Sequence, residues 1–303
     1  SGSDNWETAR RYLDLADKVY WFENGQEVSM PTDCYSSAYF VDRMLGFMQA
    51  DAARAAQPFF AYLAFQANHI PLQAPQSFID KYKGRYRAGW SVLRQERHQK
   101  AMALGVVPPH SKMVEMATTV RWDSLSAEQK AYEERKMEVY AAMAEAMDHH
   151  IGRFVEHLKQ TGQYDNTVFV FLSDNGAEAS DPYALLSGRL WLDLQYQRGI
   201  DQLGAKGAYT VIGPSWASAV ASPIVKAKSV QLSQRDFTPT FTVPQMLKDI
   251  DLILAEGDAL QVPLMQTAMT RQMMQSALAQ GWSEQDYAAI IKVVEQSAGI
   301  HQE

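Results

Sequence analysis

Apolar residues recur at helical spacing in several parts of the chain. Residues 39–48 carry apolar side chains three or four positions apart, which predicts an amphipathic helix. A capping box at 126–129 begins a much longer helix, and Gly162 is a suitable residue to end it. Residues 84–112 are rich in arginine, histidine and aromatic residues, and we expect an irregular surface excursion there.

Two short apolar runs have the character of strands. Residues 59–65 follow Pro58, and residues 167–172 are β-branched and aromatic. Each run is followed by turn-forming residues, at 68–75 and at 173–176. The order of strand, loop, helix, strand and loop predicts an α/β fold with a parallel-sheet core and flanking helices.

The end of the chain has helical periodicity only. We expect helices at about 243–255, 264–279 and 283–297, the last beginning at a Ser/Asp cap and stopping at Gly299. The sequence therefore predicts two parts, an α/β part at 1–226 and an all-α tail at 227–303.

Composition excludes several classes of partner. The net charge is -7 and no block of basic residues is present, so we expect neither a nucleic-acid nor a membrane partner. No apolar run approaches the roughly 20 residues of a membrane span, and no targeting segment is visible. We expect a soluble protein of unknown location. The single cysteine, Cys34, excludes an internal disulfide and a thiolate zinc cluster.

Metal-binding side chains follow both predicted strands. His69 comes after the first strand, and Asp174 and Asn175 come after the second. The carboxyl ends of parallel strands share one edge of a sheet, so we expect the three residues to lie close together. Carboxylate and amide oxygens suit Ca²⁺, and an added imidazole shifts the preference toward Zn²⁺ or Mn²⁺. Such a metal polarises a phosphoryl or sulfuryl oxygen. The alternative is that residues 173–176 simply form a turn.

Residues 5–226 resemble type I sulfatases of the alkaline phosphatase superfamily. The similarity lies in the segments 67–75, 147–153, 169–178 and 216–218. It implies that Asp174 and Asn175 are metal ligands and that His69 contacts a sulfate or phosphate group. The paired aspartates at the start of sulfatases have no counterpart here. Cys34 is followed by neither the proline nor the arginine of the formylglycine motif, so we do not expect a working formylglycine sulfatase.

Residues 227–303 resemble the end of 3-hydroxyisobutyrate dehydrogenases, which are β-hydroxyacid dehydrogenases. The similarity lies in 235–241, 245–249 and 281–286, and it implies that Lys248 is the lysine near cofactor and substrate. The glycine-rich dinucleotide fingerprint is absent, so we expect neither NAD binding nor hydride transfer. The apolar helix faces of the tail must bury against something, which predicts a homo-oligomer formed through the tail.

The sequence thus favours a chimera that acts as a weak or promiscuous hydrolase. Its expected substrates are small activated phosphate esters of the phosphotriester type, or aryl sulfates, hydrolysed with a divalent metal. His69 and Cys34 are the candidate catalytic residues. Three alternatives stay open: a metal-independent esterase or phosphotriesterase built on Cys34, a non-catalytic oligomerising chimera, and residual dinucleotide binding through Lys248.

Overall fold

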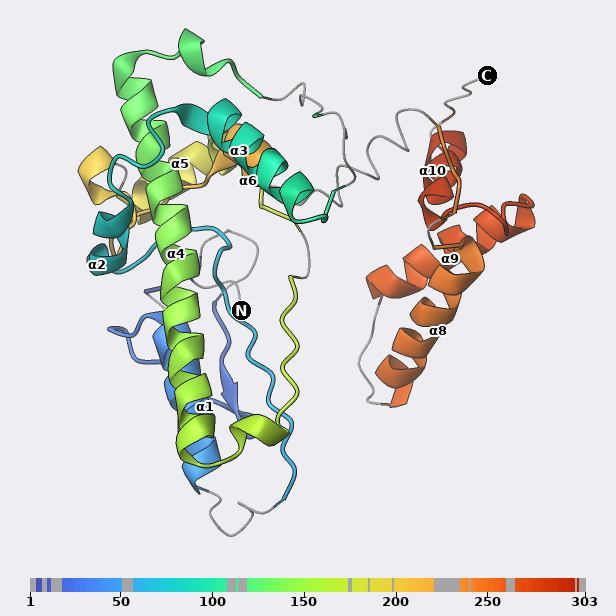
Figure 1. The fold of residues 1–303 in the computed structure, drawn as a ribbon, viewed down its shortest axis with the longest axis horizontal. Helices are drawn as coiled ribbons and strands as arrows, with labels where there is room; N and C mark the ends of the chain where they lie inside the picture. Colours follow the sequence, from blue (N-terminus) through green and yellow to red (C-terminus); the bar gives the residue numbers. More distant parts are fainter. Residues whose placement is uncertain are drawn as a thin grey trace. The chain divides into compact units, whose positions relative to one another are not determined.

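The computed structural model describes most of the chain and divides it into two compact units, Ser1–Ala221 and Ser222–Glu303 (Figure 1). The residues described are 4–6, 10–11, 18–50, 57–107, 113, 119–173, 176–184, 186–197, 199–220, 235–239, 241–259, 265–297 and 299. The two units are treated separately below.

The first unit is organised around one long helix, α4, at Ala127–Gln160. Its start is the predicted capping box, because the Ser126 hydroxyl accepts from the Gln129 amide and the Gln129 side chain accepts from the Ser126 amide. Its end is the predicted glycine stop, since Gly162 has a φ of 71° and its amide donates to the Lys159 carbonyl. Both helix-boundary predictions are confirmed.

The unit also contains shorter helices. They are α1 at Ser36–Ala50, α2 at Gln76–Ile79, α3 at Gly89–Ala103, α5 at Leu186–Gln195 and α6 at Gly213–Val220. Of these, α1 and α2 pack directly against α4. Helix α1 contains the predicted amphipathic stretch and lies along the later turns of α4, as Figure 1 shows. The expectation of irregular structure at 84–112 was wrong for the residues that form α3. This helix is held against α6 by the buried Trp90 at its start, whose ring contacts Trp216.

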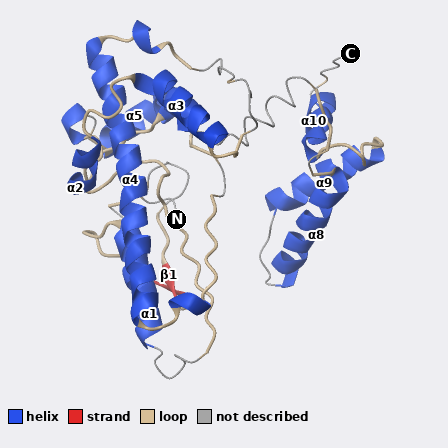
Figure 2. Ribbon diagram, viewed as in Figure 1, coloured by secondary structure: helices blue, strands red, loops and turns tan. Residues whose placement is uncertain are grey.

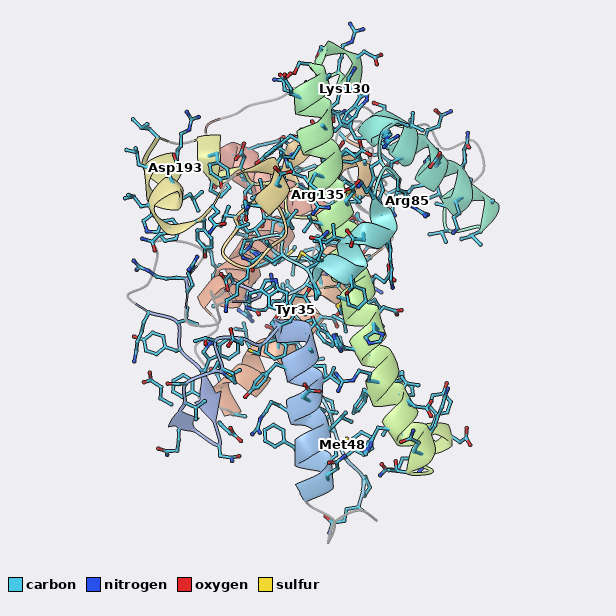
Figure 3. The ribbon with its side chains drawn as sticks, turned by 90° about the vertical axis from the view of Figure 1, so that its left-hand side faces the viewer. Tyr35, Met48, Arg85, Lys130, Arg135 and Asp193 are labelled. Carbon is cyan, nitrogen blue, oxygen red and sulfur yellow. The ribbon has the colours of Figure 1, made fainter. Side chains whose placement is uncertain are left out.

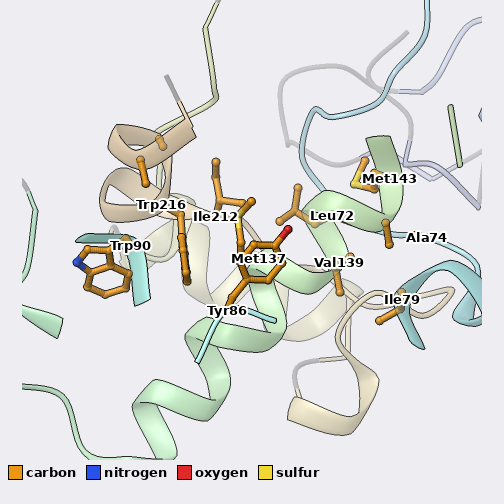
Figure 4. Close-up of a cluster of buried hydrophobic side chains, with 13 residues drawn as sticks. Leu72, Ala74, Ile79, Tyr86, Trp90, Met137, Val139, Met143, Ile212 and Trp216 are labelled. Carbon is orange, nitrogen blue, oxygen red and sulfur yellow. The ribbon is translucent and has the colours of Figure 1, made fainter. Parts of the chain in front are cut away.

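The main core lies where α3, α4 and α6 meet (Figure 4). Trp216 is completely buried there, and its ring meets the rings of Trp90 and Trp122 edge-on. Edge-on contacts place the positive edge of one ring against the negative face of another, so they add to the stabilisation by burial. The other buried members are Leu72, Ala74, Ile79, Tyr86, Met137, Val139, Ala142, Met143, Ile212, Ala217 and Ala219.

The parallel-sheet core expected from the sequence does not form within the described residues. Their only sheet is a short antiparallel hairpin of β1, Phe22–Glu23, and β2, Gln26–Glu27 (Figure 2). Asn24 and Gly25 turn the hairpin with φ values of 51° and 76°, the conformation that Asn-Gly favours in two-residue turns. In the described part of the chain, parallel pairing occurs only at two isolated bridges, one between Gln73 and Gly204 and one between Gln197 and Ala208.

The two predicted strands are extended but are not paired into a sheet. In 59–65, Ala61, Leu63 and Phe65 pack beside α1 and α4, whereas Phe60 is 94% exposed. Residues 168–172 are exposed throughout. The prediction of a strand was therefore wrong for both segments, and so was the expected burial of 59–65. A strand requires hydrogen-bonded neighbours on its edges, and an apolar run identifies a segment suited to a sheet without supplying those neighbours.

The second unit is helical, as its sequence predicted. It contains α8 at Val243–Ala259, α9 at Met265–Ala279 and α10 at Ile290–Ser297. The third helix begins later than expected, after a short 3₁₀ turn capped by Asp286, whose side chain accepts from the Ala288 amide. The apolar faces bury one another in a small core of Val243, Leu247, Ile250, Met274, Ala277 and Val293.

None of the helices in the part of the chain that the structure describes combines the length and apolar character that a bilayer crossing requires.

Candidate functional site

His69 lies on a loop that is fixed on both sides. The Asn68 side chain donates to the Tyr140 carbonyl of α4 at 2.7 Å. On the other side Ile70 is buried with Leu192, Tyr196, Tyr209 and Val211. The amide of Leu72 then donates to the Thr210 carbonyl at 3.0 Å. The imidazole itself stays 47% exposed, so a rigid backbone presents a solvent-accessible ring.

The His69 ring faces a carboxylate from the segment that follows the second predicted strand. The Nε2 atom of His69 lies 3.6 Å from Oε2 of Glu178, which is the last residue of the sulfatase-like motif at 169–178. The pKa of Glu178 is lowered from its usual value, mainly because Ser180 donates hydrogen bonds to it. Its carboxylate is therefore charged at neutral pH. His69 therefore contacts the segment that follows the predicted loop at 173–176.

Asp174 and Asn175, the predicted metal ligands, lie outside the described residues. Within the described ranges no group of three or more His, Cys, Asp or Glu side chains is arranged to hold a metal ion. The roles of Asp174 and Asn175 stay predictions.

A cavity of about 570 Å³ lies next to these loops. Tyr183 and Val211 line it and also belong to the cluster that buries Ile70. Lys136 of α4 contributes an ammonium group, which donates to Glu133 at 2.8 Å. The other lining residues are Tyr132, Asp181, Asp193 and Thr210; Asp193 lies on α5 (Figure 3).

The formal charges around the cavity are unbalanced. Glu133, Asp181 and Asp193 are acidic, and Lys136 is the one basic residue in the lining. Three negative charges and one positive charge leave a formal excess of two negative charges. In a partly enclosed space this excess disfavours an anionic ligand and favours a neutral or cationic one.

Cys34 lies in another part of the first unit, immediately before α1. Its Sγ atom donates to the Pro31 carbonyl at 3.0 Å, and the side chain is partly exposed. Lys206 binds the neighbouring Asp33 carboxylate at 2.8 Å and the Thr32 carbonyl at 2.9 Å. The catalytic role of Cys34 stays a prediction.

Comparison with known proteins accounts for both parts of the chain. Residues 4–242 match the sulfatase family, to which the chain therefore belongs. Residues 202–294 match the NAD-binding domain of NADP-dependent 3-hydroxyisobutyrate dehydrogenase. The predicted combination of two families in one chain, a chimera, is confirmed.

Individual relatives also match either the sulfatase part or the dehydrogenase part of the chain. An arylsulfatase from Klebsiella aerogenes is 35% identical over 226 residues, covering 74% of this chain and 48% of the relative. An uncharacterised sulfatase from Schizosaccharomyces pombe is 40% identical over 193 residues, covering 62% of this chain and 34% of the relative. A 2-(hydroxymethyl)glutarate dehydrogenase from Eubacterium barkeri is 38% identical over 65 residues, 22% of each chain. The chain spans half or less of the length of these relatives.

Sequence reasoning missed Glu178 and the cavity. Glu178 stands in the motif at 169–178, so its position was visible although its contact with His69 was not. Lys136 and Glu133 lie on the predicted helix α4, where a charged pair three residues apart is typical of a solvated face. Their partial burial depends on the segments around 181–183 and 210–211, which no local pattern connects to α4.

Proposed function

We propose that the first unit hydrolyses activated esters of phosphoric or sulfuric acid, and that neutral phosphotriesters are its best substrates. The observation that carries this proposal is the 3.6 Å approach of His69 Nε2 to Glu178 Oε2. It brings the loop at 66–75 against the segment that follows the second predicted strand, which is where a sulfatase-like site requires them to meet.

His69 is the residue that we expect to contact substrate. Its ring is exposed, while its loop is held by α4 and by the cluster around Ile70. A ring in this position can donate a hydrogen bond to a phosphoryl or sulfuryl oxygen, or to the departing aryl oxide. Glu178 lies close enough to orient the imidazole.

The donor chemistry around His69 fits a divalent cation. Glu178 offers a charged carboxylate within 3.6 Å of an imidazole nitrogen, and both side chains are partly exposed. We propose that Asp174 and Asn175 hold the cation. When bound there, a divalent metal supplies Lewis-acid polarisation of the ester oxygen. Oxygen ligands would suit Ca²⁺, and participation of His69 would suit Zn²⁺ or Mn²⁺.

The charge around the cavity supports the choice of substrate. A substrate that extended from His69 to the cavity would meet an excess of two negative charges. This excess would oppose a sulfate or phosphate monoester, which is an anion, and would not oppose a neutral phosphotriester. Tyr132 and Tyr183 provide ring surface for an aromatic leaving group. We therefore expect phosphotriesters to be hydrolysed faster than aryl sulfates.

The test is a panel of 4-nitrophenyl phosphotriester, phosphodiester, phosphomonoester and sulfate substrates. Each substrate is measured with and without a chelator, for the wild type and for Asp174→Ala, His69→Ala and Cys34→Ala. We expect the phosphotriester rate to fall at least tenfold with chelator, with Asp174→Ala and with His69→Ala, and to persist in Cys34→Ala.

Two other results would replace the proposal. Activity that survives chelation and Asp174→Ala but is lost in Cys34→Ala would place the chemistry on the Cys34 thiol. No activity on any substrate with any divalent metal added would favour a non-catalytic chimera.

A further inference from the structure

A short apolar segment between α4 and the His69–Glu178 contact is exposed along its whole length. In residues 168–172 the exposed fractions are 90% for Val168, 47% for Phe169, 78% for Val170, 78% for Phe171 and 69% for Leu172. Soluble monomers rarely leave five consecutive large apolar residues in water, because each exposed side chain forgoes the free energy of burial.

The backbone of this segment is extended and is not part of a sheet. Within the described residues no backbone hydrogen bond joins 168–172 to another segment, and no residue of it belongs to a strand. An extended chain with free edges and apolar side chains can accept a further strand. The segment is therefore suited to pairing through its backbone as well as through its side chains.

The composition of the segment favours an identical partner. Residues 167–172 read Thr-Val-Phe-Val-Phe-Leu, with high β-propensity and with no charge, proline or glycine. Six-residue segments of this kind pair with copies of themselves, since identical side chains interdigitate and no like charges oppose one another.

The exposed area is of the size that a dimer requires. Five side chains at these exposures present about 100 to 200 Å² each, or roughly 700 Å² together, against about 800 Å² per partner in a standard interface. Phe60 and Tyr62, exposed at 94% and 74% on the other extended segment, provide further apolar surface in the same unit.

We propose that a second copy of this chain pairs with residues 168–172, strand against strand, and that this contact forms a homodimer. Two-fold symmetry makes the paired strands antiparallel, because each copy contributes the same segment to an isologous interface. This proposal does not depend on any catalytic activity. It differs from dimerisation through the tail, whose helices already bury one another around Leu247 and Ile250.

The experiment measures the molar mass of the full chain in solution by light scattering over a range of concentrations. Val170→Lys places a charge in the centre of the segment. The matched control is Leu252→Lys, since Leu252 on α8 is 61% exposed and lies in the tail. Circular dichroism of each variant checks that the helices are retained. We expect wild type and Leu252→Lys to be dimers and Val170→Lys to dissociate at least tenfold more readily.

A disulfide scan tests the geometry without destabilising the segment. Single cysteines at 168, 169, 170 and 171 are introduced in a Cys34→Ser background and oxidised. We expect covalent dimers from the positions nearest the two-fold axis and not from a cysteine placed at exposed Leu194 on α5. A monomeric wild type at every concentration would overturn the proposal. So would a dimer that survives Val170→Lys and is lost in Leu252→Lys, and so would equal cross-linking at all positions.

Discussion

The indole nitrogen of Trp216 on α6 donates to the backbone carbonyl of Glu133 on α4 at 2.9 Å. The same Glu133 lines the cavity and binds Lys136 through its side chain. One hydrogen bond in the core thus fixes the part of α4 from which two cavity residues project.

Replacement of Trp216 by phenylalanine removes the hydrogen bond to the Glu133 carbonyl, and this loss is expected to lower the free energy of unfolding by about 0.5–1.5 kcal/mol in addition to the effect of the smaller ring. Urea denaturation followed by circular dichroism measures the change. Trp191→Phe is the control, since Trp191 is only partly buried. A loss of the same size in both variants would mean that ring volume, and not the hydrogen bond, determines the effect.

The capping box of α4 gives a second prediction about stability. Ser126→Ala removes the acceptor of the Gln129 amide, and we expect a loss of about 1 kcal/mol in urea denaturation. Thr242→Ala removes the corresponding acceptor of the Gln245 amide before α8, in the other unit. Because the two units have separate cores, we expect amide hydrogen exchange to rise in α4 for the first variant and in α8 for the second. A rise in amide hydrogen exchange in the same helix for both variants would contradict this expectation.

Asp4 makes the stability of the first unit depend on pH. Its side chain is buried, and burial raises its pKa from 3.8 to about 6. The folded state therefore holds the proton more tightly than the unfolded state. The associated stability is present below about pH 4 and is lost as the pH rises through about 6, to a total of about 3 kcal/mol.

Asp4→Asn removes this titration, so its stability relative to the wild type should increase between pH 4 and pH 6. The measurement is the urea midpoint at each pH. Asp165→Asn serves as the control, because Asp165 is exposed. A constant difference between wild type and Asp4→Asn across this range would show that Asp4 does not retain its proton.

Glu178→Gln separates the catalytic from the structural role of the contact with His69. Both side chains are partly exposed, so the ion pair contributes about 0.2–1 kcal/mol at most and the melting temperature should change little. If Glu178 orients the imidazole, kcat/KM for a phosphotriester should fall about tenfold. Glu156→Gln, at an exposed position on α4, is the control. Unchanged kinetics in Glu178→Gln would remove Glu178 from the site.

Local sequence signals predicted α1, α4 and the helices of the tail, and they missed α3, α5 and α6. The Ser126 box, the Gly162 stop and the periodicity of the tail all act within a few residues, and the structure follows them. The strands were not predictable in this way. Residues 59–65 and 167–172 have strand composition, yet a strand exists only if distant segments pair with it.

The candidate site was also predictable only in part. The meeting of His69 with the segment after 172 was predictable from the motifs, because both belong to the sulfatase resemblance. The cavity was not, since Lys136 and Asp181 are brought together only by the packing of α4 against later segments.

The side chain of Gln73 is buried within the loop that carries His69, and both the oxygen and the nitrogen of its amide are hydrogen-bonded. Its oxygen accepts from the Asn5 amide at 2.9 Å, and its nitrogen donates to the Ala208 carbonyl at 2.8 Å. Three stretches far apart in the chain thus share one amide group. Both partners are backbone groups, which almost any residue at positions 5 and 208 would offer. Homologous sequences should therefore keep a side-chain amide at position 73, while this contact leaves the residue types at positions 5 and 208 unconstrained.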